Sequence, residues 1–221
     1  MKAFWRSIPF IFMLGVANAA DGSPPLTFVP SIGIGWNQLT FGRPGGTVNA
    51  NYKTLNMGLT MAYGRFFASA DGEWLGKANF QDGVDFTSVE REDQTLAVGM
   101  AFNRWNVFTG YTSAETKDDF LGEFHYDQGL FVGAGYDFPV GHNRLGFSIA
   151  YADLDGRIYA DGVGLIESGK IRGLSYRVGF SGPFRKNMGY KLFARYRSYD
   201  FDSGGVVTDK DILSFGALIS F

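Results

Sequence analysis

The chain of 221 residues contains no cysteine and only two histidines, His125 and His142. The lack of cysteine excludes disulfides, thiolate metal sites and a lipid anchor on a cysteine that follows a signal peptide. The sequence also has no His-x-x-x-His pair and no phosphate-binding glycine loop. Because so few side chains suited to catalysis or metal binding are present, we predict no cofactor, no bound metal and no catalytic residues.

Long apolar runs are also missing. After residue 20, no stretch approaches the roughly 20 apolar residues that a membrane-spanning helix needs. A shorter apolar run covers residues 8–16, preceded by Lys2 and Arg6 and followed by small residues that end in Ala19. This pattern predicts a secretory signal peptide, residues 1–19, that is removed by cleavage. Any crossing of a membrane must then use strands.

Positive charge is not in excess. Without Lys2 and Arg6, the mature domain of residues 20–221 has 18 basic and 22 acidic side chains, a net charge of −4. Binding to nucleic acid depends on Lys and Arg side chains that neutralise phosphates. We therefore predict no nucleic-acid partner.

The chain is rich in glycine and aromatic residues, with 31 glycines and 17% Phe, Trp and Tyr. The final segment, residues 212–221, alternates small or polar residues with Leu213, Phe215, Ala217, Ile219 and Phe221. A period of two predicts a strand with one apolar face. In water such an edge strand would promote aggregation, whereas a closed barrel in lipid has no open edge and no apolar face in contact with water.

The same alternation recurs along the chain and predicts ten strands. Their ranges are 26–37, 54–63, 66–74, 96–102, 105–111, 130–138, 145–151, 174–180, 190–196 and 212–221. Short turns alternate with longer polar segments, which we interpret as external loops at 77–92, 113–124, 153–170 and 201–210. These features predict an all-β protein, a transmembrane antiparallel up-and-down β-barrel of ten strands, with eight strands as the alternative. An even number of strands places both chain ends on the periplasmic side.

An alternating last strand that ends in Phe221 resembles the C-terminal signal of bacterial outer-membrane barrels. Over nearly the whole mature domain, the pattern is similar to that of small outer-membrane barrel proteins of the porin and opacity type. The resemblance implies a Gram-negative outer membrane, contact with its lipid, and recognition of the last strand by the barrel-assembly machinery. It identifies no single family, so no site residues follow from it.

Six charged residues have the inward parity of the predicted strands. They are Asp71, Glu73, Arg177, Lys191, Arg195 and Arg197. Side chains fill the lumen of a barrel of about eight strands, and ten strands widen it only modestly. We interpret the six charges either as a salt-bridged plug or as the wall of a narrow pore whose basic lining favours anions. Counting residues up from the turns predicts that Asp71 pairs with Arg195, and Glu73 with Arg197.

Two further signals lie in the predicted loops. His125 follows Glu123 by two residues and is the candidate base for a hydrolase at the rim of the barrel. Asp153, Asp155 and Asp161 partly resemble a calcium-binding loop, but the distal Glu spacing is missing. Asp-Gly pairs are also common in ordinary turns, so we do not assign a calcium site.

The combined pattern predicts a non-enzymatic integral outer-membrane barrel. We expect it to act as a narrow solute channel or, through its loops, as a surface-exposed interaction or structural protein. Its partner would then be a small solute or a surface ligand. The alternative function is a barrel-rim hydrolase that acts on lipid or peptide.

Overall fold

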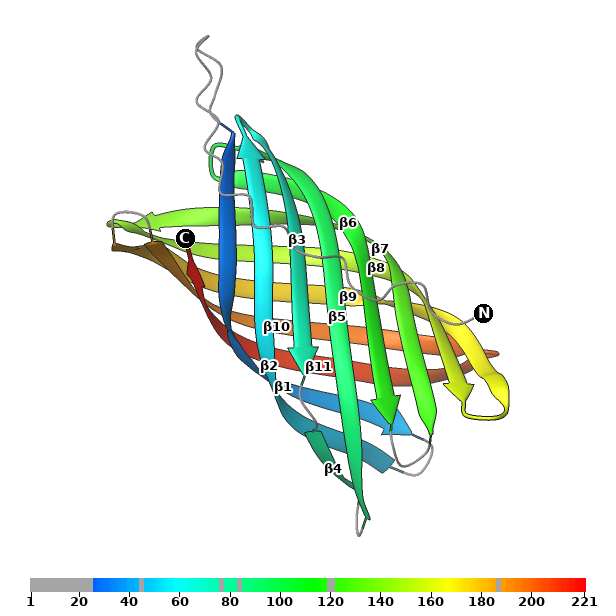
Figure 1. Ribbon diagram of the computed structural model, residues 1–221. Helices are drawn as coiled ribbons and strands as arrows, with labels where there is room; N and C mark the ends of the chain where they lie inside the picture. The colour runs from blue at the N-terminus through cyan, green and yellow to red at the C-terminus, as the bar shows by residue number, and fades with distance from the viewer. Residues whose placement is uncertain (1–25, 44–45, 76–77, 83–84, 119–121, 186–187) are drawn as a thin grey trace.

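The computed structural model describes residues 26–43, 46–75, 78–82, 85–118, 122–185 and 188–221. The predicted signal peptide lies outside these ranges. In the part of the chain that is described, no helix is long and apolar enough to cross a membrane. Nearly all described residues belong to β-strands (Figure 1).

The strands form one antiparallel sheet that closes on itself (Figure 1). In chain order they are β1 (Thr27–Arg43), β2 (Gly46–Tyr63), β3 (Phe66–Leu75), β4 (Ala78–Asp82), β5 (Asp85–Phe102), β6 (Trp105–Asp118), β7 (Glu123–Val140), β8 (Asn143–Ala160), β9 (Gly164–Arg185), β10 (Met188–Ser203) and β11 (Val206–Ser220). β11 returns to pair with β1, and β3 pairs with β5. The short β4 continues beyond β3 and pairs with the far part of β5, so β3 and β4 share one position in the barrel. The predicted antiparallel up-and-down barrel is confirmed, with ten strand positions rather than eight.

The two ends of the barrel differ. At the end that we call the terminus end, the start of β1 meets the end of β11, and the Phe221 amide donates to the Pro30 carbonyl at 3.1 Å. The tight turns after β2, β5 and β7 lie at this end. The opposite end, which we call the hairpin end, carries the connections after β1, β6, β8 and β10.

The predicted faces of the strands are confirmed by the exposure of their side chains. On β1, Ile34 is 71% exposed on the outer surface, whereas Asn37 is 1% exposed on the inner one. On β11, Phe215 is 45% exposed and Ile212 is fully buried. Outward apolar residues on the other strands repeat this pattern and form the surface that lipid would cover.

The predicted loops are wrong for most of their length, because the strands continue through them. The segment 153–170 consists of the end of β8, a turn at 161–163 and the start of β9. Along this part of β8 the outward residues become charged, at Asp153 and Asp155, while inward Leu154 stays buried. The apolar alternation stops where the outer face leaves the lipid band, but the backbone ladder continues because its hydrogen bonds do not depend on side chains.

The other three predicted loops are corrected in the same way. Strands occupy most of the described parts of 77–92, 113–124 and 201–210. These parts lie beyond an outer ring of aromatic residues, which are Trp36, Trp74, Tyr111, Tyr151 and Tyr196. We call the portions of the strands beyond this ring the strand extensions.

Candidate functional site in the lumen

The hairpin-side half of the lumen is filled by inward side chains from all around the barrel. Nine strands contribute buried residues to it: Asn37, Leu39, Tyr52, Thr54, Arg91, Asp93, Ala114, Asp127, Ala152, Leu154, Ile171, Arg197, Tyr199, Phe201, Lys210, Ile212 and Ser214. The tenth position, β3, contributes Glu73, whose side chain is 11% exposed, and its partner Arg195 on β10, 21% exposed, is included with it. We call this set of residues the sealing layer.

A chain of ion pairs crosses the sealing layer. Glu73 lies 2.6 Å from Arg195 and 3.7 Å from Arg197, measured from its Oε2 to the Nη2 atoms. Arg197 continues to Asp93, with 3.3 Å between Nη1 and Oδ2. Asp93 in turn accepts from Arg91 through both of its oxygens, at 2.7 and 3.3 Å. The chain joins β10, β3 and β5, which are far apart in the sequence, and it holds three positive against two negative charges.

Neutral polar groups add hydrogen bonds to this network, but among the described residues Arg195 Nε, Arg197 Nε and Asn37 Oδ1 find no partner. Asn37 donates from Nδ2 to Glu73 Oε1 at 3.0 Å, and the Thr54 hydroxyl donates to the same oxygen at 3.4 Å. Glu73 therefore uses both carboxylate oxygens, one for the arginines and one for the neutral donors. On the other side of the network, Arg91 donates to the Thr116 hydroxyl at 2.7 Å. A buried charge is tolerated when it is paired and hydrogen-bonded in this way.

The rest of the sealing layer is mostly apolar. A cluster on β8, β9 and β10 consists of Ala152, Leu154, Ile171, Tyr199 and Phe201, with Phe131 and Ile158 packed against it. Beside the network, the Lys210 ammonium donates to the Asp127 carboxylate, and both side chains are about nine-tenths buried. Apolar side chains and ion pairs thus lie side by side in this half of the lumen.

The terminus-side half of the lumen is more open, and we call it the vestibule. Asp71 and Lys191 are exposed there, and Arg177 is half-buried. The guanidinium of Arg177 stacks over the ring of Phe193, with its Cζ 4.6 Å from the ring centroid. Asp71 and Lys191 are thus exposed, whereas the charged side chains of the sealing layer are at most about one-fifth exposed.

The structure divides the six predicted lumen charges into two groups. Glu73, Arg195 and Arg197 belong to the sealing layer, and Asp71, Arg177 and Lys191 belong to the vestibule. The expected contact between Glu73 and Arg197 is present, but the carboxylate beside Arg195 is that of Glu73 rather than Asp71. Counting residues from the turns ignores the stagger of neighbouring strands in a barrel, and this stagger shifts the pairing by one inward step.

Sequence reasoning missed Arg91, Asp93, Asp127 and Lys210. The first two fell in the segment 77–92 or at its border, and the others also lay outside the predicted strands. A signal was present, because Asp93 and Arg91 continue the odd-numbered inward positions of β5. Extending the parity of each strand past its last apolar residue would have found them.

His125 lies on the strand extension of β7, near the hairpin-end rim. Its Nε2 is 3.3 Å from Glu123 Oε2. Burial lowers the pKa of His125, and the charge of Lys210 lowers it further, while Asp127 and Glu123 oppose the shift. A neutral imidazole beside a carboxylate is the arrangement that a general base needs.

Two of the three acidic residues of the calcium-like segment, Asp153 and Asp155, pair with basic residues. Lys170 Nζ is 2.7 Å from Asp155 and 3.9 Å from Asp153, and Arg172 Nε is 3.5 Å from Asp153. The hydrogen bond from Lys170 lowers the pKa of Asp155. Within the described ranges, no three His or acidic side chains gather in a way that could hold a metal ion.

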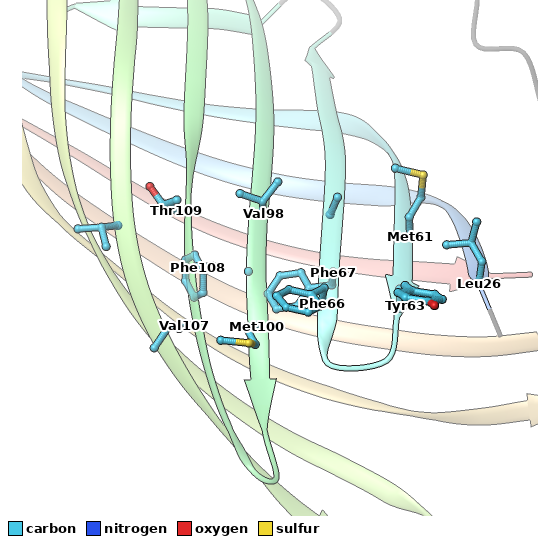
Figure 2. Close-up of a pocket in the computed structure, with 14 residues that line it drawn as sticks. Leu26, Met61, Tyr63, Phe66, Phe67, Val98, Met100, Val107, Phe108 and Thr109 are labelled. Atoms are coloured by element: carbon cyan, nitrogen blue, oxygen red, sulfur yellow. The ribbon is translucent and has the colours of Figure 1, made fainter. Parts of the chain in front are cut away.

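An apolar pocket lies at the terminus end of β2, β3, β5 and β6 (Figure 2). Its lining includes Met61, Phe66 and Val98, which point to the outer surface, and the inward Phe67 and Phe108. Most of the lining residues lie on the outer face, and the Phe67 ring covers the space that Gly99 leaves on the inner one. The pocket therefore belongs to the lipid-facing band, and it contains no group suited to catalysis.

No family model matches the chain, and no curated protein matches it. Among solved structures, the outer-membrane protease OmpT of Escherichia coli matches 88% of this chain and 96% of its own, with a TM-score of 0.59 and 10% identity. The translocator domain of the autotransporter NalP of Neisseria meningitidis matches 87% of this chain and 88% of its own, with a TM-score of 0.50 and 10% identity. At this identity the likeness shows the fold, that of bacterial outer-membrane β-barrels.

Proposed function

We propose that this protein is an integral outer-membrane barrel with a sealed lumen that acts through its external surface and not as a solute channel. The sealing layer is the observation that supports a closed lumen. In a conducting pore the charges at the constriction face water, yet Arg197 is 8% exposed and Asp93 is 7% exposed. Water that passed this layer would have to displace the ion-paired side chains of β3, β5, β7, β10 and β11 and the apolar side chains beside them.

The strand extensions supply the surface that would act. At the tip between β8 and β9, Val163 is 77% exposed and Leu165 is 54% exposed. Both lie beyond the outer ring of aromatic residues that surrounds the barrel. Val206, at the tip between β10 and β11, is also exposed. Apolar side chains that protrude into water are candidates for contact with another molecule. We place the hairpin end outside the cell and the terminus end in the periplasm, where Phe221 would be available to the barrel-assembly machinery.

Planar-bilayer recording of the refolded protein tests the closed lumen. We expect no steady conductance from the wild type. The double variant Asp93→Ser with Arg197→Ser removes one charge of each sign from the sealing layer and should open a measurable conductance. A steady, ion-selective conductance of the wild type would show that the lumen is a channel.

The external surface needs a separate test. Cells that carry the protein can be compared with cells that carry the variant Val163→Ser with Leu165→Ser for adhesion to extracellular-matrix proteins and to other cells. We expect weaker adhesion of the variant at an equal amount of folded protein. If cells with the wild type and cells with the variant adhere equally well, at or above the level of cells without the protein, the β8–β9 tip does not take part in adhesion.

A rim hydrolase is the second candidate, and the contact between His125 and Glu123 is the observation that favours it. The folded protein should then cleave a peptide or lipid substrate, and His125→Ala should abolish cleavage without changing the folded fraction. His142→Ala is the matched control, because His142 is exposed in a turn at the opposite end. If the wild type cleaves no peptide and no lipid substrate, or if His125→Ala cleaves as fast as the wild type, the hydrolase is excluded.

A further inference from the structure

We propose that the vestibule contains a binding site for a small oxyanion of the phosphate type, formed by Arg177 and Lys191 beside Phe193. Both basic residues point into the lumen on the terminus side of the sealing layer. The site depends on these side chains and not on whether the lumen conducts, so it is independent of the closed barrel proposed above.

The position of Arg177 is set by its neighbour across the sheet. Arg177 on β9 stands directly opposite Arg195 on β10 in the antiparallel register. Two like charges in this position repel each other. Arg195 turns to Glu73 in the sealing layer, whereas Arg177 stacks on the Phe193 ring, one inward step closer to the terminus end. The guanidinium of Arg177 therefore lies against Phe193, on the terminus-end side of Arg195.

Lys191 approaches Phe193 from the terminus end of the barrel. Its Cε lies 3.7 Å from the position that a Cβ on Gly179 would occupy. Gly179 stands directly opposite Phe193, between the levels of Arg177 and Lys191. In the register of β9 and β10, Arg177 and Lys191 flank this pair, one inward step to either side. The Lys191 side chain thus passes over Gly179, where the missing side chain leaves a small hollow, and Arg177 lies one inward step away on the same strand as that glycine.

Neither cation is neutralised by a direct contact. Within the described residues, no carboxylate lies within 4 Å of the Arg177 or Lys191 nitrogens, and the buried Nε of Arg177 has no hydrogen-bond acceptor. Two acidic residues point into the same half of the lumen, Asp71 on β3 and Asp137 on β7. The Asp71 carboxylate lies over Gly58, however, and that of Asp137 over Gly146. A mobile anion would supply the contacts that these two carboxylates do not make.

The chemistry of the two cations fits an oxyanion. The planar guanidinium offers paired N–H groups that match two oxygens of one phosphate, and the ammonium adds a flexible third donor. The hollow over Gly179 would accept a Cβ without a clash, because the nearest atoms, Leu192 O and Lys191 Cε, both lie 3.7 Å away. Lys191 is exposed, so the ligand would enter from the terminus end without passing the sealing layer.

Thermal unfolding of the refolded full chain in an uncharged detergent tests the site. Inorganic phosphate and glycerol phosphate are each compared with chloride at equal ionic strength. We expect phosphate to raise the unfolding temperature in a saturable way. A response to both probes indicates a phosphate group carried by a larger molecule, and a response to inorganic phosphate alone indicates the free ion; either supports the site.

Four variants locate the site. Arg177→Gln and Lys191→Gln should each weaken the apparent affinity roughly tenfold, the effect of losing a charge-assisted hydrogen bond. Gly179→Val keeps both charges but fills the hollow, and it should weaken binding as well. Lys170→Gln removes an exposed charge from the strand extension and should leave the apparent affinity for phosphate unchanged.

The folded fraction of each variant is measured first by heat-modifiable electrophoretic mobility. If Arg177→Gln does not fold, Lys191→Gln and Gly179→Val still decide the outcome. The site is excluded if phosphate stabilises the wild type no more than chloride does, or if all the variants respond as the wild type does.

Discussion

At the scale of single residues, Glu73 holds the sealing layer together. It contacts Arg195 and Arg197 with one oxygen and Asn37 and Thr54 with the other. Asp71 lies two residues away on the same strand, carries the same charge and is exposed in the vestibule. The two carboxylates therefore form a natural pair for comparison, because they share strand and face but differ in burial and in partners.

We expect Glu73→Gln to lower the free energy of unfolding by about 3 kcal/mol, because it leaves two arginines without their shared carboxylate in a buried layer. Asp71→Asn should cost less than about 1 kcal/mol, since water hydrates that side chain. Urea unfolding of the protein in lipid vesicles measures both changes.

A double-mutant cycle tests the contact itself. Glu73→Gln and Arg195→Gln should show a coupling energy of about 1 kcal/mol or more, whereas Asp71→Asn and Arg195→Gln should be additive. Coupling of Asp71 and additivity of Glu73 would mean that the barrel has the register expected from counting residues, rather than the one described above.

His125 supplies a second prediction at this scale. Burial lowers its pKa in the folded state below the ordinary value of 6.5, so below that pH the unfolded chain binds a proton more readily than the folded one. Stability from this group is complete above about pH 6.5 and is lost as the pH falls. We expect the wild type to lose more stability than His125→Gln between pH 7.5 and 5.5. If His142→Gln reduces the pH dependence as much as His125→Gln does, burial of His125 is not the cause.

At the scale of the elements, apolar alternation determines what the sequence reveals. The position and face of each membrane-level strand could be predicted, since Ile34 and Asn37 differ in polarity as they differ in exposure. The strand extensions could not, because outside lipid both faces can be polar while the backbone ladder continues. The sequence predicted that acidic and basic side chains meet in the lumen, but it paired Arg195 with Asp71 instead of Glu73. The pairing differs by one inward step because the stagger between strands depends on closure of the whole sheet.

The lipid face can be tested on neighbouring residues of one strand. Leu59 on β2 points outward near the middle of the apolar band, and Thr60 points inward. We expect Leu59→Arg to cost about 2–4 kcal/mol, the cost of an arginine at the bilayer midplane. Thr60→Arg should cost much less, because lumen water can hydrate the charge. Refolding into vesicles of defined lipid measures both, and equal costs would mean that the two faces are assigned the wrong way round.

At the scale of the whole molecule, the barrel is asymmetric along its axis. At the terminus end the apolar outer surface begins within a few residues of the turns, as at Leu145 after Asn143. At the hairpin end the strands continue past the aromatic ring with charged outer faces, as at Asp153 and Asp155. A bilayer that covers the apolar band leaves the extensions in water on one side and the short turns near the surface on the other.

This asymmetry predicts the orientation of the barrel in the cell. Gly141 and Gly162 are matched sites for an epitope tag, since both lie in turns with positive φ and have no atom within 4 Å of an added Cβ. A tag at either site should therefore leave the fold intact. We expect antibody to label the Gly162 tag on intact cells, and the Gly141 tag only after the outer membrane is permeabilised. If only the Gly141 tag is labelled on intact cells, the barrel has the opposite orientation, with the vestibule and Arg177 on the outside. Labelling of both would mean that the terminus-end turns also reach the outer surface, and the assignment of that end to the periplasm would be wrong.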